Sequence, residues 1–182
     1  NQIGHFVLAQ AHFHDKDLTG FWPHVERALE LNRYDSTSAA LLGILIGHAG
    51  DWERGGRILR EAMALHPHHP SWCYIGLFLE AYQKGDYEAA LAAVRRINLP
   101  GFFWAEISRA AVCAQLGRDE EAQAAVRELL KLVPDFAERA YELFEVWHDD
   151  SELIEIQIDG LEKAGLKIPG RRRPRGGAET RP

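Results

Sequence analysis

A helical segment pattern that recurs three times limits the fold of this chain more than any other feature. Each copy runs from a glycine turn through an amphipathic helix to a proline: AGDWERGGRILREAMALHPHHP over Ala49–Pro70, QKGDYEAALAAVRRINLP over Gln83–Pro100 and QLGRDEEAQAAVRELLKLVP over Gln115–Pro134. The turn glycines Gly50, Gly85 and Gly117 are 35 and 32 residues apart. A period of about 20–50 residues is typical of arrays of one supersecondary unit. Because a single helical hairpin cannot bury its apolar face, we expect the units to stack.

The turns predict where helices end and begin. A glycine after the last helical residue can adopt the left-handed conformation that closes a helix. Two of the turn glycines are followed by aspartate, Asp51 and Asp86, which can accept from the free N–H groups of the next helix. A proline then ends the second helix of each of the three copies, whereas Arg33 replaces it in the first unit. The first unit, over residues 2–35, lacks a Gly-Asp pair and fits the pattern least well.

These signals predict an all-α fold, a right-handed α-α superhelix of antiparallel hairpins. We expect helices over residues 2–14, 21–32, 36–49, 52–65, 71–84, 87–98, 102–116, 119–132, 136–148 and 150–165. They group into units over 2–35, 36–69, 71–104 and 103–136 and a helical cap over 137–166, which together form one repeat domain over 1–166. In the cap, residues 149–151 suit a helix N-cap and Gly165 suits a C-cap. The basic, Gly- and Pro-rich segment 167–182 is predicted to be disordered.

The period and the residue pattern resemble the tetratricopeptide repeat (TPR), which places two helices in about 34 residues. Residues 36–69 fit best, with Leu42-Gly43 and Gly50-Asp51-Trp52 at positions that the repeat favours. Small residues in this repeat let the two helices of a hairpin approach closely. Gly55 departs from the pattern, which has alanine at that position.

Several longer segments resemble a bacterial TPR module found in larger proteins: GDWERG, HPHHPSW, GDYEAAL, INLPGFFW, LGRDEEAQAAVRELL, PDFAER and DGLEKAGL. This module looks like the C-terminal half of many class III nucleotide cyclases and of winged-helix regulators with TPR tails. The resemblance covers about residues 1–166. It implies a regulatory or interaction module whose catalytic or DNA-binding domain would lie upstream. Because the chain starts without methionine, we expect it to be a fragment of a longer protein.

Composition excludes some functions. The 182 residues are 46% apolar and carry a net charge of −6, which argues against a folded nucleic-acid binder. No apolar run is long enough to span a membrane, and no signal peptide is visible. The two cysteines, Cys73 and Cys113, fall in apolar helical pattern, which favours buried thiols of a reducing compartment. We therefore expect a cytoplasmic protein.

No chemical motif emerges from the sequence. A Gly-rich phosphate loop, a nucleophile elbow and a paired zinc motif are all missing. The run His66-Pro67-His68-His69-Pro70 has no second pair of ligands at helical spacing and is interpreted as a turn between repeats. We predict no catalytic residue, no cofactor and no metal.

The resemblance points to the first helix of each unit as the wall of a concave groove. At those positions the chain is apolar and aromatic, and it lacks the Lys, Arg and Asn that clamp a peptide carboxylate in well-known members. The candidate groove consists of Phe6, Gln10, Phe13, Ile44, His48, Trp72, Ile75, Leu79, Tyr82, Gln83, Trp104, Ile107 and Gln115. Either these residues form an open binding surface, or a tight superhelix buries them against its own terminal helices.

The predicted function is that of a protein–protein interaction or regulatory scaffold in a signalling protein, acting by apolar burial without catalysis. The partner would be a protein, a peptide or a second copy of the chain, with no nucleic acid bound by the folded domain and no membrane contact. One alternative is the C-terminal part of a nucleotide cyclase whose activity lies upstream. A second alternative is a homodimerisation spacer.

Overall fold

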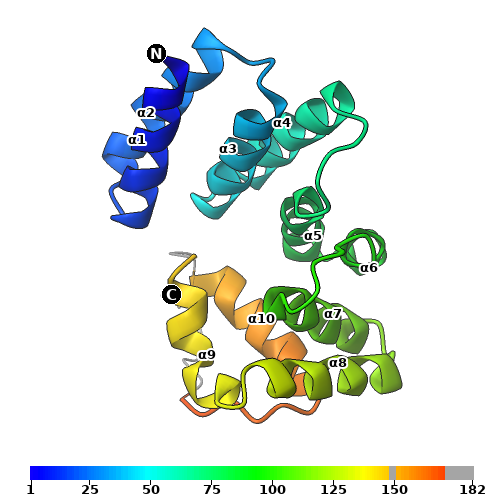
Figure 1. Ribbon diagram of the computed structural model, residues 1–182. Coiled ribbons are helices and arrows are strands. Elements are labelled where there is room, and N and C mark those ends of the chain that lie inside the picture. The colour runs from blue at the N-terminus through cyan, green and yellow to red at the C-terminus, as the bar shows by residue number, and fades with distance from the viewer. Residues whose placement is uncertain (148–150, 171–182) are drawn as a thin grey trace, which may run out of the picture. The chain divides into compact units, whose positions relative to one another are not determined.

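The computed structural model describes residues 1–147 and 151–170, and these residues form ten helices and no strand (Figure 1). The helices are α1 (Gln2–His14), α2 (Leu18–Leu31), α3 (Ser36–His48), α4 (Trp52–Leu65), α5 (Cys73–Gln83), α6 (Tyr87–Val94), α7 (Phe103–Gln115), α8 (Asp119–Leu132), α9 (Phe136–Glu145) and α10 (Ser151–Lys163). The chain divides into two compact units, one over residues 1–105 and one from residue 106 onward. The all-α prediction is confirmed.

Most helix boundaries lie within two residues of the predicted ranges. Helix α9 ends at Glu145 rather than residue 148, and the boundaries of α2 and α6 differ for local reasons. Helix α2 begins at Leu18 rather than residue 21, because the Asp17 side chain accepts a hydrogen bond from the Gly20 N–H and caps it there. Helix α6 ends at Val94 rather than residue 98. After it, the N–H of Ile97 donates to the Val94 carbonyl, a tighter turn than an α-helix makes.

One turn geometry joins the two helices of the hairpins α3–α4, α5–α6 and α7–α8. At Gly50, the glycine N–H donates to the Gly47 carbonyl and the following Asp51 N–H donates to the Ile46 carbonyl. These paired bonds are a Schellman motif, which requires a left-handed residue at the glycine position. The φ angles of Gly50, Gly85 and Gly117 are +102°, +73° and +68°. The predicted glycine turns are therefore confirmed.

The first hairpin makes the same turn without glycine. Lys16 has a φ of +60°, its N–H donates to the Phe13 carbonyl, and the next N–H, of Asp17, donates to the His12 carbonyl. Sequence reasoning found no Gly-Asp pair here, yet the backbone follows the same path. The cap of α10 repeats the motif at Gly165, where φ is +96°, and this confirms the predicted C-cap.

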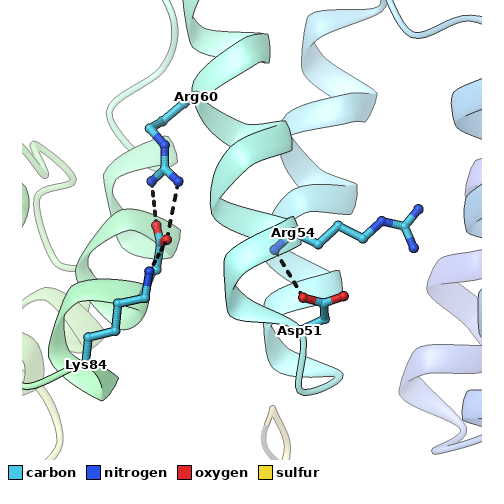
Figure 2. A network of polar contacts seen from close by, with 5 residues as sticks. Asp51, Arg54, Arg60 and Lys84 are labelled. Carbon is cyan, nitrogen blue, oxygen red and sulfur yellow. Dashed lines mark hydrogen bonds and ion pairs between the residues drawn. The ribbon is translucent and has the colours of Figure 1, made fainter.

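Aspartate caps the second helix after several of these turns. The Asp51 carboxylate accepts from the Arg54 N–H at 3.1 Å (Figure 2), and Asp86 accepts from the Ala89 N–H at 3.1 Å. Both predicted N-caps are confirmed. The N-cap predicted at residues 149–151 cannot be assigned in the same way, because residues 148–150 lie outside the described part of the chain.

Glycines set the separation of α3 and α4. A Cβ on Gly43 would lie 2.8 Å from the carbonyl oxygen of Gly55, and a Cβ on Gly55 would overlap the Gly43 carbonyl and lie 2.8 Å from the Gly47 nitrogen. The two backbones are therefore in direct contact. Gly55, which departs from the repeat pattern, occupies the closest point of the crossing, where alanine would not fit.

The hairpins of the first unit pack as a continuous series. Helix α1 pairs with α2, α3 with α4 and α5 with α6, while α3 also contacts α1 on one side and α5 on the other. The first helices of successive hairpins therefore form a row, which we call the first-helix row (α1, α3 and α5). This row positions the candidate site.

The second unit closes with α9 and α10. Phe136 and Phe144 on α9 are fully buried, and the Tyr141 hydroxyl donates to Glu155 on α10 at 2.9 Å. Helix α10 also reaches α7, where the Gln115 amide donates to Asp159 at 3.2 Å. Packing continues past α10 to Ile168, which is only 6% exposed. Residues 171–182 of the predicted tail lie outside the described chain.

Candidate functional site

The first-helix row is almost free of formal charge. Helices α1 and α3 contain no Asp, Glu, Lys or Arg, and α5 contains only Glu80. The partner helices α2 and α4 carry charged side chains along their exposed surfaces. The first two hairpins therefore each have an uncharged helix beside a charged one. Any contact made by the row relies on apolar and neutral polar groups.

The structure divides the predicted groove residues into three classes of exposure. Five are buried: Phe13, His48, Leu79, Tyr82 and Ile107. Seven are half-buried: Phe6, Gln10, Ile44, Trp72, Ile75, Trp104 and Gln115. Gln83 is exposed. Ile107 and Gln115 belong to the second unit and the others to the first.

The buried members serve the core. The ring of Tyr82, 1% exposed, lies 5.3 Å from the Phe78 ring and 5.2 Å from the Tyr87 ring. His48 lies between Phe13 and Trp52, with ring centroids 6.2 and 5.2 Å away. Such buried side chains have little accessible surface for a partner to contact. The accessible part of the candidate groove in the first unit is therefore its half-buried and exposed members.

Trp72 has a mixed role. It is half-buried and packs against the core cluster of Ala39, Ala40, Leu59, Ala62 and Cys73. Its removal would disturb this cluster as well as any surface contact. Phe6 and Ile75 are therefore better probes of binding than Trp72.

Sequence reasoning missed part of the apolar surface of α1. Ile3, Val7 and Leu8 are 62%, 53% and 45% exposed, and none of the three is among the candidate groove residues. The available signal was composition, because α1 is apolar on all sides rather than on one face. Grouped exposed apolar side chains mark interaction surfaces more often than scattered ones do.

The one charge of the row is neutralised internally. Glu80, 5% exposed, accepts hydrogen bonds from Arg60 on α4 and from Lys84 one turn along α5 (Figure 2). Burial raises the pKa of the Glu80 carboxyl, but the hydrogen bonds and charges of Arg60 and Lys84 together lower it below its ordinary value. Gly56 leaves room for this carboxylate, which a Cβ there would overlap. The ion pair therefore fastens α5 to α4.

Two open clefts lie between second helices. One, of about 730 Å³, separates α2 from α4 and is lined by Leu29, Ile58 and Leu65 together with both acidic and basic side chains. The other, of about 390 Å³, is lined from α4, α5 and α6 and includes Arg60, Tyr74 and Arg96. The guanidinium of Arg96 stacks 4.7 Å from the Tyr74 ring centre, which orders this rim.

The histidine-rich segment is the turn that the sequence predicts. His66 and His68 are exposed, while the His69 ring bonds through Nδ1 to the His66 carbonyl and through Nε2 to the Tyr74 hydroxyl. No group of three His, Cys, Asp or Glu in the described residues could hold a metal. Cys73 and Cys113 are free and buried, as predicted, and burial raises the pKa of the Cys73 thiol to about 11.

Comparison with known proteins identifies the fold. No protein-family model matches the chain, and no curated protein matches it. Two crystal structures of MamA do. The first is 18% identical to this chain with a TM-score of 0.60, and the match covers 86% of this chain and 92% of that MamA chain. The second is 17% identical with a TM-score of 0.62, and the match covers 90% of this chain and 89% of that MamA chain.

The fold is TPR-like. At this level of identity the likeness to MamA establishes the helical repeat architecture alone. It supports the resemblance drawn from the Gly-Asp turns. Neither MamA structure is named as a cyclase or a winged-helix regulator, so that part of the resemblance stays a prediction. No helix in the described ranges is both long and apolar enough to cross a membrane.

Proposed function

We propose that this TPR-like chain is a protein–protein interaction module that binds an apolar peptide or helix on its first-helix row. The observation that carries the proposal is the lack of charge on α1, α3 and α5 together with half-buried apolar side chains at Phe6, Ile44 and Ile75. Burial of apolar area drives association without requiring charge pairs.

The chemistry of the row also defines the partner. A clamp for a C-terminal carboxylate needs cationic side chains, and α1, α3 and α5 contain no Lys or Arg. The partner would therefore present apolar side chains, with neutral hydrogen bonds to Gln10 or Gln83 fixing its position. No covalent step is involved, because binding by shape and burial suffices. Attachment to an upstream signalling domain stays part of this proposal.

Peptide selection tests this surface. A displayed library of random peptides is selected against the intact chain, and the recovered peptides are titrated against Phe6→Lys and Ile75→Lys. A lysine on this apolar surface should weaken binding at least about 10-fold, since an uncompensated charge would lie against apolar groups. The matched control is Ala124→Lys on the exposed surface of α8. Melting temperatures within about 2 °C of the unmodified chain show that each variant stays folded.

Equal affinity for the unmodified chain and both lysine variants would remove the first-helix row as the binding surface. Weaker binding by the Ala124→Lys control as well would point to a charge effect unrelated to the row. Selected peptides rich in Lys or Arg would contradict the predicted apolar chemistry.

Self-association is the second candidate function. The specific observation is the exposed apolar set Ile3, Val7 and Leu8 on α1, which a second copy could cover. Sedimentation measurements over a wide concentration range test it. Val7→Lys should abolish any dimer, and a chain that is monomeric throughout would exclude this function.

A further inference from the structure

A cluster of three histidines joins α1 to α2. His5 on α1 and His24 on α2 approach through their Nδ1 atoms, which are 2.9 Å apart. The ring of His12, also on α1, stacks on His24 with centroids 5.3 Å apart. His12 in turn bonds through Nδ1 to the Asp17 carboxylate at 2.8 Å. We call this set the histidine latch: His5, His12, His24 and Asp17.

The His5–His24 contact is a hydrogen bond with one donor. The ring centroids are 5.1 Å apart and the Nδ1 atoms 2.9 Å apart, so the two rings meet edge to edge through these nitrogens. One Nδ1 must carry a proton and the other must offer its lone pair. The pair can hold one positive charge, on the donor ring. It cannot hold two, because both Nδ1 atoms would then be donors.

The backbone leaves room for the latch. A Cβ at Gly20 would overlap the His12 ring and lie 2.5 Å from the Asp17 carboxylate. The first turn of α2 therefore approaches α1 closely at this point. His12 keeps a favourable partner when it is protonated, because Asp17 is an anion. Among the described residues, neither His5 nor His24 pairs with a carboxylate.

A further charge near His5, that of Arg27 on α2, is also positive. Burial lowers the pKa of His5 most, and the charges of His24 and Arg27 lower it further. Asp35, at the N-terminus of α3, is acidic, but its carboxylate already accepts hydrogen bonds from Ser38 and from the Gln2 amide. Protonation of His5 is therefore disfavoured on every side.

We infer that the histidine latch is a pH-sensitive contact that holds α1 against α2 at neutral pH and weakens as pH falls through the histidine range. The second proton breaks the His5–His24 hydrogen bond and places two cations next to each other. Helix α1 carries Phe6 and Gln10, so more frequent opening on acidification would change the surface that the first hairpin presents.

The direction of the effect follows from linkage. The folded-state pKa of His5 lies below its unfolded value, so the opened hairpin binds a proton that the closed one does not. The free energy of opening therefore decreases as pH falls through the histidine range. If one histidine stays neutral in the closed state, lowering the pH from 7.5 to 5.0 can increase the equilibrium constant for opening by at most about 30-fold.

Hydrogen exchange of the whole chain tests the latch. Amide exchange in α1 and α2, corrected for the intrinsic effect of pH, should increase by about 3- to 30-fold from pH 7.5 to 5.0. Amides of α8, which contains no histidine, should show no such change. The variant His5→Phe keeps a ring but cannot be protonated, so the increase should disappear. The control His68→Phe, in the exposed turn, should retain it.

Two results would overturn the latch. One is exchange in α1 and α2 that does not change with pH in the unmodified chain. The other is a pH-dependent increase that persists in His5→Phe. If that variant does not fold, an NMR titration of the histidine ring resonances in the unmodified chain tests the latch instead. The midpoint of His5 should lie below the ordinary histidine value of about 6.5, and a midpoint at or above that value would refute the inference.

Discussion

Replacing Gly55 by alanine tests the closest helix crossing in the chain. The new Cβ would overlap the carbonyl oxygen of Gly43 and lie 2.8 Å from the Gly47 nitrogen. Both neighbours are backbone atoms, so no side-chain rotation can relieve the overlap. Helices α3 and α4 would have to separate by roughly 1 Å to restore ordinary contact distances.

The expected loss of stability is about 2 kcal/mol. Forcing an extra methyl group into a packed site costs typically about 1–3 kcal/mol, and a rigid backbone neighbour places Gly55 at the upper end. Alanine returns about 1 kcal/mol because it is a better helix former than glycine. With a cost near 3 kcal/mol, the net effect is a loss of about 2 kcal/mol, or about 8 °C in melting temperature at about 4 °C per kcal/mol.

Thermal unfolding followed by circular dichroism measures this change. Gly4→Ala is the matched control, because Gly4 lies in α1 and a Cβ there meets nothing within 4 Å. The same chemical change should raise its melting temperature by about 4 °C through helix propensity alone. If Gly55→Ala melts within about 1 °C of the unmodified chain or above it, α3 and α4 do not cross as described.

Two further predictions concern the turns and the internal ion pair. Gly85→Ala should lose about 1 kcal/mol in urea denaturation because its φ of +73° disfavours a Cβ, whereas Lys16→Gly should gain about 0.5 kcal/mol; opposite signs would contradict the shared turn geometry. Glu80→Gln should be less stable than the unmodified chain at pH 7, and the difference should be smaller at pH 3. The lowered pKa of Glu80 stabilises the fold above the ordinary glutamate range, and this stabilisation decreases as pH falls from that range through the lower pKa of the folded state. An equal difference at both pH values would refute the role of Arg60 and Lys84.

Local signals in the sequence were sufficient for much of the fold. The turns at Gly50, Gly85 and Gly117 and the caps at Asp51 and Asp86 depend on contacts within six residues, so residue type and spacing predict them. The start of α4 follows from the Asp51 cap, and the start of α8 follows from the turn at Gly117. The turn at Lys16 was missed, because lysine adopts a left-handed conformation only when the surrounding structure holds it there.

The candidate site was less predictable. Helices α1 and α3 are apolar around most of their circumference, so periodicity does not show which side faces the core. Phe13 and Tyr82 turned out to be buried, while Val7 and Leu8 are exposed. The contact between His5 and His24 joins residues 19 positions apart, and only the register of two packed helices brings them together.

By itself, the sequence determined that this chain forms helical hairpins joined by glycine and aspartate turns, because those features depend on backbone conformation and short-range hydrogen bonds. Only the tertiary structure decided which apolar side chains remain accessible, how closely Gly55 approaches Gly43, and that a histidine pair joins α1 to α2. These properties depend on the distance and rotation of one helix relative to another. That geometry is set by the packing of many side chains together and not by any one stretch of sequence.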